Sequence, residues 1–400
     1  MLCLYIILVI FITGPTVGYS SDTVSEKGAT DKLKKETGGK RILENFEGYT
    51  YTEKAEFMYD KVFELYYIEG FDLFLENYPC QPDDRGFSYL WPFSGVFSAV
   101  NAMSRLPEKG ENYRSDIDRV LRGLERYWDK YSKAGGYDCY VVEFGGGQKF
   151  YDDNTWIGLE VIRAYEVKKD IRLLNKAKQV FNFVISGWSE KGGIYWREHD
   201  FKTRNTCSNG PAIVFALKLY QITGEQDYLD WGLKIYKWVN SNLYSPGGAY
   251  WDSISSEGKI DKRTYTYNTG IMLHANVLLY QITKDEKYLN EAEKITQASL
   301  EHFAVREKDG IRFFPDTPWF NNILFKGYLA LYEINKDSTY IEIMIKNVDY
   351  AWMHARDKYD LIGPDWSGET KGGTDYKWLL DQAAMVELYA LISIWKNQNQ

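Results

Sequence analysis

Two adjacent aspartates, Asp152 and Asp153, are the residues of this chain best suited by type and spacing to do chemistry. They lie between a Gly-rich segment, residues 145–147, and a run with helical periodicity, residues 156–165. Paired carboxyl groups can divide acid–base work, because one donates a proton while the other attacks the reacting carbon or activates water. The simpler alternative is helix capping, since Asp oxygens accept the free N–H groups of a helix N-terminus.

A repeated segment indicates which elements position this pair. Each copy ends one helical stretch at a Tyr, turns through a Lys or Gly followed by an acidic residue, and starts a second helical stretch. The copies recur roughly every 50–60 residues, which is typical of a repeated supersecondary unit. They cover residues 165–174, 220–229, 280–289 and 332–341.

Extended to both ends, the repeat predicts an all-α fold. One set of about six helices, rich in Ala, Gly and Leu, begins near residues 91, 152, 209, 268, 318 and 376 and should be buried. A second set, with alternating charge, begins near residues 52, 111, 170, 225, 285 and 337 and should be half-exposed. Inner and outer helices that alternate in this way predict an (α/α)6 toroid of six helical hairpins, a single domain over residues 49–400.

The long return loops precede the inner helices, so all of them should meet at one rim of the toroid. Gly-Gly followed by aromatic residues at 192–196 and 247–251 predicts small hairpins there. Loops on one face of a rigid scaffold commonly carry binding and catalysis, and sugars stack their C–H faces on Trp and Tyr rings. Any single ring is more often a packing residue, but the set beside the Asp pair predicts a carbohydrate cleft. Its members are Trp91, Trp196, Trp251, Tyr267, Trp319, Trp366 and Trp378, with Asn209 and Asn268.

Glycoside hydrolysis is the reaction that such a cleft and an acid pair fit best. Adjacent residues have Cα atoms about 3.8 Å apart, and their side chains diverge by about 100° on a helix. A carboxyl separation near the roughly 5–5.5 Å of retaining enzymes is attainable, and the wider inverting geometry stays open. Burial and the neighbour's charge would raise the pKa of one carboxyl group and leave the other ionised.

With these residues the sequence resembles glycoside hydrolase family 76, the α-1,6-mannanases of bacteria with fungal relatives that remodel cell-wall mannan. The resemblance covers roughly residue 52 to the C-terminus and rests on the segments 151–156, 193–196, 207–212 and 266–270. It implies a retaining, endo-acting mannanase without a cofactor, in which Asp152 is the nucleophile and Asp153 the general acid/base. The expected substrate-binding residues are Trp91, Trp196, Asn209, Tyr267, Asn268 and Trp366, and Tyr151 and Trp156 would support the pair from behind.

Composition and the N-terminal segment predict an exported protein that handles a neutral ligand. The net charge of −8 disfavours nucleic acid as a partner, because phosphate binding needs a basic face. The apolar run from Leu2 to Ile12 predicts a signal peptide over residues 1–20, and polar residues 21–48 predict a disordered linker. After removal of the leader no membrane span is expected. The remaining cysteines, Cys80, Cys139 and Cys207, should be free, and we expect a monomer.

Three other functions are compatible with parts of the pattern. A mannan transglycosylase would use the same fold and the same carboxyl groups. A non-catalytic glycan-binding protein would need the aromatic residues and not the acids. Sugar epimerases with α/α toroids use paired histidines, and the four candidates here are His199, His274, His302 and His354, of which His274 should be a core residue of an inner helix. The chain has no phosphate-binding loop or HExxH motif, so no metal or nucleotide is expected.

Overall fold

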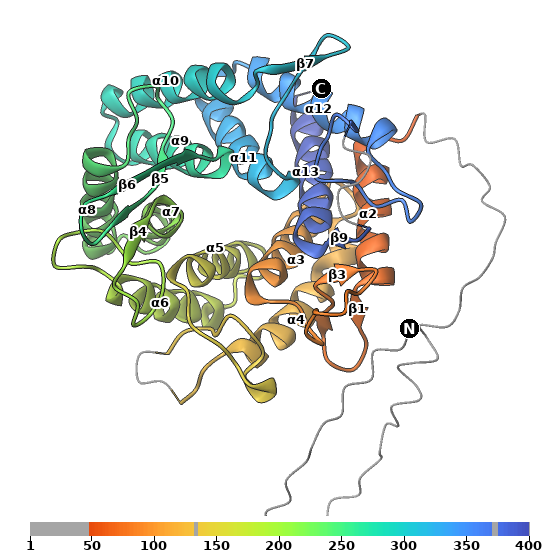
Figure 1. The fold of residues 1–400 in the computed structure, drawn as a ribbon, viewed down its shortest axis with the longest axis horizontal. Coiled ribbons are helices and arrows are strands. Elements are labelled where there is room, and N and C mark those ends of the chain that lie inside the picture. Colours follow the sequence, from red (N-terminus) through yellow and green to blue (C-terminus); the bar gives the residue numbers. More distant parts are fainter. Residues whose placement is uncertain (1–47, 132–134, 370–374, 400) are drawn as a thin grey trace, which may run out of the picture. The chain divides into compact units, whose positions relative to one another are not determined.

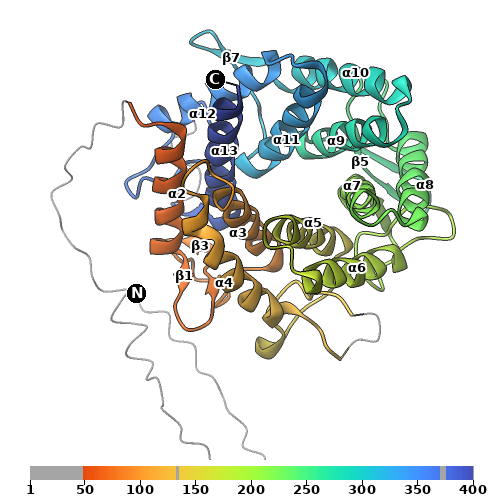
Figure 2. The ribbon, with the colours of Figure 1, turned by 180° about the vertical axis from the view of Figure 1, so that it is seen from behind.

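The computed structural model describes residues 48–131, 135–369 and 375–399. The predicted signal peptide, and all of the predicted linker except Gly48, lie outside these residues. From Tyr49 onward the chain forms one compact unit, in which helices alternate between an inner and an outer ring (Figure 1). Figure 2 shows the same ring from behind.

The inner ring consists of six helices that are largely buried. These are α3 (Leu90–Met103), α5 (Tyr151–Lys168), α7 (Thr206–Thr223), α9 (Thr266–Thr283), α11 (Pro318–Asn335) and α13 (Leu379–Gln398). Small residues allow these helices to approach closely: a Cβ on Gly270 of α9 would lie 2.3 Å from the Leu324 Cα of α11. Such a contact has room only for glycine.

The outer ring consists of six amphipathic helices, each packed on the inner helices with one apolar face. These are α2 (Tyr51–Leu65), α4 (Arg114–Leu124), α6 (Ile171–Ser186), α8 (Gln226–Asn242), α10 (Glu286–Phe303) and α12 (Thr339–His354). Together, the two rings confirm the predicted (α/α)6 fold in the described part of the chain.

The tight turns from inner to outer helices follow the repeat. Four inner helices end at a residue in the left-handed conformation, Lys169, Gly224, Lys284 or Lys336. An acidic residue then starts the next outer helix. The Asp170 carboxylate accepts the Arg172 N–H, and the Asp285 carboxylate accepts the Lys287 N–H.

The return loops carry short strands at one rim. β4 (Thr203–Asn205), β5 (Trp251–Ser255) and β6 (Ile260–Thr264) form an antiparallel three-stranded sheet, and β7 (Arg306–Lys308) pairs with β8 (Ile311–Phe313). The Gly-Gly segment at 192–196 forms only an isolated bridge between Trp188 and Ile194. The Gly-Gly segment at 247–251 likewise forms an isolated bridge, between Tyr244 and Tyr250. Both predicted hairpins are therefore reduced to bridges, and the β5–β6 hairpin begins only at the last residue of the second segment.

The ring closes by contacts between the two ends of the described chain. α13 packs against both α2 and α3, as both views show (Figures 1 and 2). β3 (Asn77–Tyr78) pairs with β9 (Lys377–Trp378), with Asn77 opposite Trp378. Within the residues that the structure describes, no helix has both the length and the apolar character needed to cross a membrane.

Candidate active site

Asp152 and Asp153 lie in the first turn of α5, at the rim where the return loops meet. The N-cap of this helix is Phe150, whose side chain makes no capping hydrogen bond. The simple capping role is therefore wrong for the pair, although the first backbone N–H groups of the helix do stabilise the Asp152 carboxylate. Both side chains are half-buried.

Two side chains from other segments hold the Asp152 carboxylate. Trp196 Nε1, in the loop before β4, donates to Asp152 Oδ2 at 3.0 Å. Cys207 Sγ, in the first turn of α7, donates to the same oxygen at 3.2 Å. The backbone fixes Trp196 as well, because the Tyr151 N–H donates to its carbonyl at 2.9 Å. Asp152 is thus oriented by three chain segments that only the fold brings together.

The two carboxyl groups differ in their electrostatic environments. Burial raises the pKa of Asp152 to about 6, and the hydrogen bonds from Cys207, Trp196 and the helix N-terminus limit the rise. Burial, together with the negative charge of Asp152, raises the pKa of Asp153 well above its ordinary value. The hydrogen bonds to Asp152 favour its ionised form, whereas burial and the Asp152 charge favour the protonated form of Asp153. Two unequal carboxyl groups of this kind suit acid-assisted nucleophilic attack.

A chain of side chains around the mouth of the ring starts at Asp152. Each member is the second residue of its inner helix: Asp152 in α5, Cys207 in α7, Tyr267 in α9 and Trp319 in α11. The Tyr267 hydroxyl lies near the Cys207 sulfur, and the Tyr267 and Trp319 rings are 5.8 Å apart. Trp91, the second residue of α3, follows at 5.3 Å from Trp319. The structure thus brings the predicted Trp91 and Tyr267 into one layer with the acid pair.

The two predicted supporting residues lie behind the pair. The buried Tyr151 ring stacks on Phe183 of α6 at 5.0 Å. Trp156, also buried, meets Trp319 edge-on at 5.0 Å and so connects α5 to the aromatic layer. Both rings fix the position of the first turn of α5.

Asn209 differs from its prediction as a substrate-binding residue, because its amide is occupied by backbone. It accepts the Ile194 N–H at 2.7 Å and donates to the Ile194 and Asn205 carbonyls at 2.9 and 2.8 Å. The fourth residue of two other inner helices does the same: Asn154 binds Tyr137, and Gln382 binds Ile362. This position is a repeated clamp on the preceding return loop.

Two further predicted residues are buried rather than open to a ligand. Asn268 has no exposed surface, and neither its amide oxygen nor its amide nitrogen bonds another described residue. Trp366, in the segment between α12 and α13, is 2% exposed. The structure does not bring either residue into contact with Asp152, whereas Trp196 is 38% exposed beside it.

Sequence reasoning missed Cys207 as a site residue. The signal that could have found it is its register: it follows the helix start by one residue, as Asp152 and Tyr267 do in the neighbouring repeats. The described cysteines Cys80, Cys139 and Cys207 are all free, as expected. No group of His, Cys, Asp and Glu side chains among the described residues is arranged to hold a metal ion.

Comparison with known proteins places the chain in a family of glycosidases. The sequence model of glycosyl hydrolase family 76 matches residues 50–393, so the chain belongs to this family. A crystal structure of a family 76 glycoside hydrolase from a bovine Bacteroides thetaiotaomicron strain superposes with a TM-score of 0.80 at 32% identity, over 87% of this chain and 78% of that one.

A second solved structure is named as an inactive variant of an α-1,6-mannanase from Salegentibacter sp. HEL1_6 in complex with α-1,6-mannotetrose. The variant replaces two neighbouring aspartates by alanine. This structure is 25% identical in sequence to the present chain and superposes with a TM-score of 0.72. The match covers 86% of the present chain and 99% of the mannanase chain.

Among curated relatives, the mannan endo-1,6-α-mannosidase DCW1 of Saccharomyces cerevisiae is 30% identical over 43% of this chain and 42% of its own length. The meiotically up-regulated gene 191 protein of Schizosaccharomyces pombe is 25% identical over 61% of this chain and 59% of its own length. The chain thus spans between two fifths and three fifths of the length of these two relatives.

Proposed function

We propose that this chain is an endo-acting glycoside hydrolase that cleaves α-1,6-mannosidic bonds in mannan backbones with retention of configuration. The observation that carries the proposal is the unequal acid pair. Asp152 accepts hydrogen bonds from Trp196 and Cys207, which favour its ionised form, while burial and the charge of Asp152 raise the pKa of Asp153 well above its ordinary value. The names of the relatives support α-1,6-mannan as the substrate class. The double aspartate replacement in the mannanase variant named as inactive supports a catalytic role for an adjacent aspartate pair.

The proposed mechanism follows from the protonation states. The Asp152 carboxylate attacks the anomeric carbon of a mannosyl unit while Asp153 gives its proton to the departing glycosidic oxygen, which leaves as the free hydroxyl of the shortened chain. A covalent glycosyl ester on Asp152 results. Asp153, now ionised, removes a proton from water as the water attacks the same carbon, and both carboxyl groups return to their starting states.

The residues that would grip the sugar are aromatic. Trp196 is the most exposed ring at the pair, and Tyr267 and Trp91 continue the layer around the mouth. Rings of this kind offer flat apolar faces with polar edges, which suit the C–H faces and hydroxyl groups of mannose. We leave Asn209 out of the proposed contacts because backbone groups occupy its amide. Asn268 and Trp366 remain predictions, as do a monomeric state and export.

Replacement of each carboxyl group tests the proposal directly. Asp152→Asn and Asp153→Asn should each lower kcat on debranched α-1,6-mannan by about three orders of magnitude or more, because the covalent and proton-transfer steps both depend on the pair. Asp285→Asn is the matched control, since Asp285 caps α10 and Asn is an equally good cap. Near wild-type turnover by either pair variant, with a folded protein by circular dichroism, would refute the assignment.

The pH dependence supplies a second test. Catalysis needs Asp152 ionised and Asp153 protonated, so kcat/KM should rise with pH through about 6 and fall again at higher pH as Asp153 loses its proton. The two limbs belong to the coupled pair rather than to single residues. Proton NMR of the first-formed product distinguishes retention from inversion. Product analysis with added acceptor sugar separates hydrolysis from transglycosylation, and a glycan-binding protein would release no reducing ends.

A further inference from the structure

Cys207 is a buried thiol that points at the reacting carboxylate. It is 6% exposed, lies one residue into α7, and donates through Sγ to Asp152 Oδ2 at 3.2 Å. The adjacent Ser208 is equally buried, yet its hydroxyl bonds no other described residue. Contact with Asp152 is therefore a property of position 207 and not of the whole turn.

The surroundings keep this thiol protonated. Burial and the nearby charges of Asp152 and Asp252 raise the pKa of Cys207 well above its ordinary value. A protonated thiol has one hydrogen to donate, and an ionised carboxylate is an acceptor only. The hydrogen bond therefore runs from Cys207 to Asp152 and favours the ionised state of Asp152.

Tyr267 extends the contact by one residue. Its hydroxyl lies near the Cys207 sulfur, so three neighbouring inner helices place Tyr267, Cys207 and Asp152 in a row. The charged or titratable groups around Asp152 are Asp153 on its own helix, Cys207 on α7 and Tyr267 on α9, with Asp252 of β5 close to the last two. None of them is a cation, so the donors Cys207 and Trp196 and the helix N-terminus are what oppose the burial of the Asp152 charge.

We propose that Cys207 is a positioning residue for Asp152, which aims the carboxylate oxygen and keeps it ionised at mildly acid pH through the hydrogen bond from its thiol. This inference rests on the proposed function. Sulfur is a weak donor, so it lowers the energy of the carboxylate less than a hydroxyl would and preserves more of its nucleophilicity. Cys207 itself forms no bond to substrate in this scheme.

The first experiment compares pH–rate profiles. In Cys207→Ala the acid limb of kcat/KM should move up by about half to one pH unit, because one donor to the charged form is lost. At pH 5 the rate should then fall by about 3–10-fold, with a much smaller change at the plateau. Cys207→Ser restores a donor and should return the limb to the wild-type position or below. Ser208→Ala, the matched neighbour, should leave the limb in place.

These profiles distinguish positioning from packing. A purely structural Cys207 would lower the melting temperature, or the rate at every pH, and the acid limb of the alanine variant would stay where it is. That result would overturn the proposal, as would failure of Cys207→Ser to restore the limb in a protein that melts like the wild type.

A second experiment needs no catalysis, so it separates this inference from the proposed function. The S–H stretching band of Cys207 is isolated as the infrared difference between the wild type and Cys207→Ala. It should move to higher frequency as Asp152 is protonated at low pH, and the Asp152→Asn variant should show no such titration. A band that is independent of pH in the wild type would overturn the proposal even if mannan is cleaved, and a titrating band would support it even if mannan is not.

Discussion

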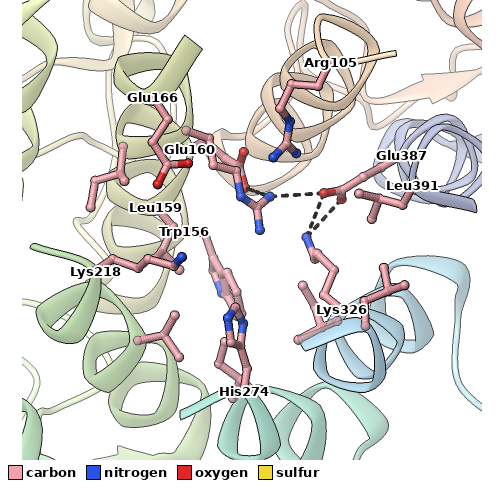
Figure 3. Close-up of a pocket in the computed structure, with 16 residues that line it drawn as sticks. Arg105, Trp156, Leu159, Glu160, Glu166, Lys218, His274, Lys326, Glu387 and Leu391 are labelled. Atoms are coloured by element: carbon pink, nitrogen blue, oxygen red, sulfur yellow. Dashed lines mark hydrogen bonds and ion pairs between the residues drawn. The ribbon is translucent and has the colours of Figure 1, made fainter. Parts of the chain in front are cut away.

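The two ends of the inner ring bury carboxyl groups in opposite ways. At the mouth that holds the acid pair, Asp152, Asp153 and the buried Asp381 of α13 have no cation within ion-pair distance among the described residues, and burial raises the pKa of each, to about 7 for Asp381. At the other end, a cavity of about 220 Å³ has a wall of paired charges (Figure 3). There the Glu387 carboxylate forms ion pairs with Lys326 Nζ at 3.0 Å and with Arg163 Nη1 at 3.1 Å.

Figure 3 shows how the cavity is built from all sides of the ring. Charged groups come from α5, α7, α11 and α13 and from Arg105 just after α3, and His274 of α9 faces the same space. The sequence predicts His274 to be a core residue. In the structure it is instead half-buried and faces a polar cavity. Burial lowers its pKa, and the surrounding Lys218, Arg163 and Lys326 lower it further.

Partners, more than burial, decide the electrostatic outcome at the two ends. Burial alone would raise the pKa of Glu387, but Lys326 and Arg163 outweigh it and bring the value to about 2. The carboxyl groups at the mouth with the acid pair, Asp152, Asp153 and Asp381, have no ion-pair partner among the described residues. Neutral donors and the other carboxyl groups surround them. The paired end therefore contributes stability at neutral pH, and the unpaired end gives up stability for reactivity. Four variants test this contrast.

The largest effect is expected from Glu387→Gln. It leaves Lys326 and Arg163 without a buried counter-charge and should cost about 3–5 kcal/mol of unfolding free energy at pH 7. Because the folded pKa of Glu387 is depressed, its contribution is present above the ordinary value of 4.5 and is lost as pH falls toward 2. Urea unfolding at pH 7 and at pH 3 measures both, and the difference from wild type should shrink at pH 3.

The exposed Glu333→Gln variant is the control for this loss. Glu333 pairs with Lys336 on the surface and should contribute less than about 0.5 kcal/mol. The folded fraction of Glu387→Gln should keep wild-type specific activity on mannan. If Glu387→Gln lost activity without losing stability, the contrast between a stabilising end with paired charges and a reactive end with unpaired carboxyl groups would be wrong.

Next in size is Asn209→Ala. Removal of the clamp leaves the buried Ile194 N–H and carbonyl unpaired and should cost about 1–3 kcal/mol. Asn268→Ala is the matched comparison, an equally buried Asn whose amide bonds no other described residue, and it should cost less. Thermal unfolding of both variants measures the difference. Equal losses would argue against the clamp.

Trp196→Phe should have a moderate effect on activity. It keeps an aromatic ring beside Phe150 but removes the donor to Asp152. The residue is partly exposed, so water can replace part of the bond, and kcat/KM should fall about tenfold on the acid side. Steady-state kinetics between pH 5 and pH 8 measure it. Trp188→Phe, which removes an indole that packs on Trp231 of α8, should leave the profile unchanged.

The smallest effect is a gain in stability for Asp153→Asn. The folded pKa of Asp153 is raised, so its burial costs nothing below the ordinary value of 3.8 and costs progressively more as pH rises from there through the folded pKa. The neutral variant should therefore be more stable than wild type by at least about 1 kcal/mol at pH 7 and equal to it near pH 4. Melting temperatures at the two pH values test this, and a variant less stable at pH 7 would contradict the contrast.

The helices, their alternation and the acid pair could all be predicted from the amino-acid sequence. A Tyr and then a Lys or Gly at the end of four inner helices, followed in two of them by Asp170 or Asp285, define the turns through local backbone rules. The repeat then implies that equivalent loops share one rim, which places Asp152, Trp196 and Tyr267 together. These features depend on local conformation and on periodicity, and both are determined by residues that lie close together in the sequence.

Only the tertiary structure decided what each side chain contacts. Asn209 was predicted to bind substrate and is a loop clamp, and Cys207 was predicted only to be a free cysteine and donates to the Asp152 carboxylate. The ion pairs of Glu387 with Arg163 and Lys326 join residues more than 60 positions apart. Such contacts depend on the angular position of each helix around a closed ring, and a closed ring is fixed by long-range packing that no local pattern encodes.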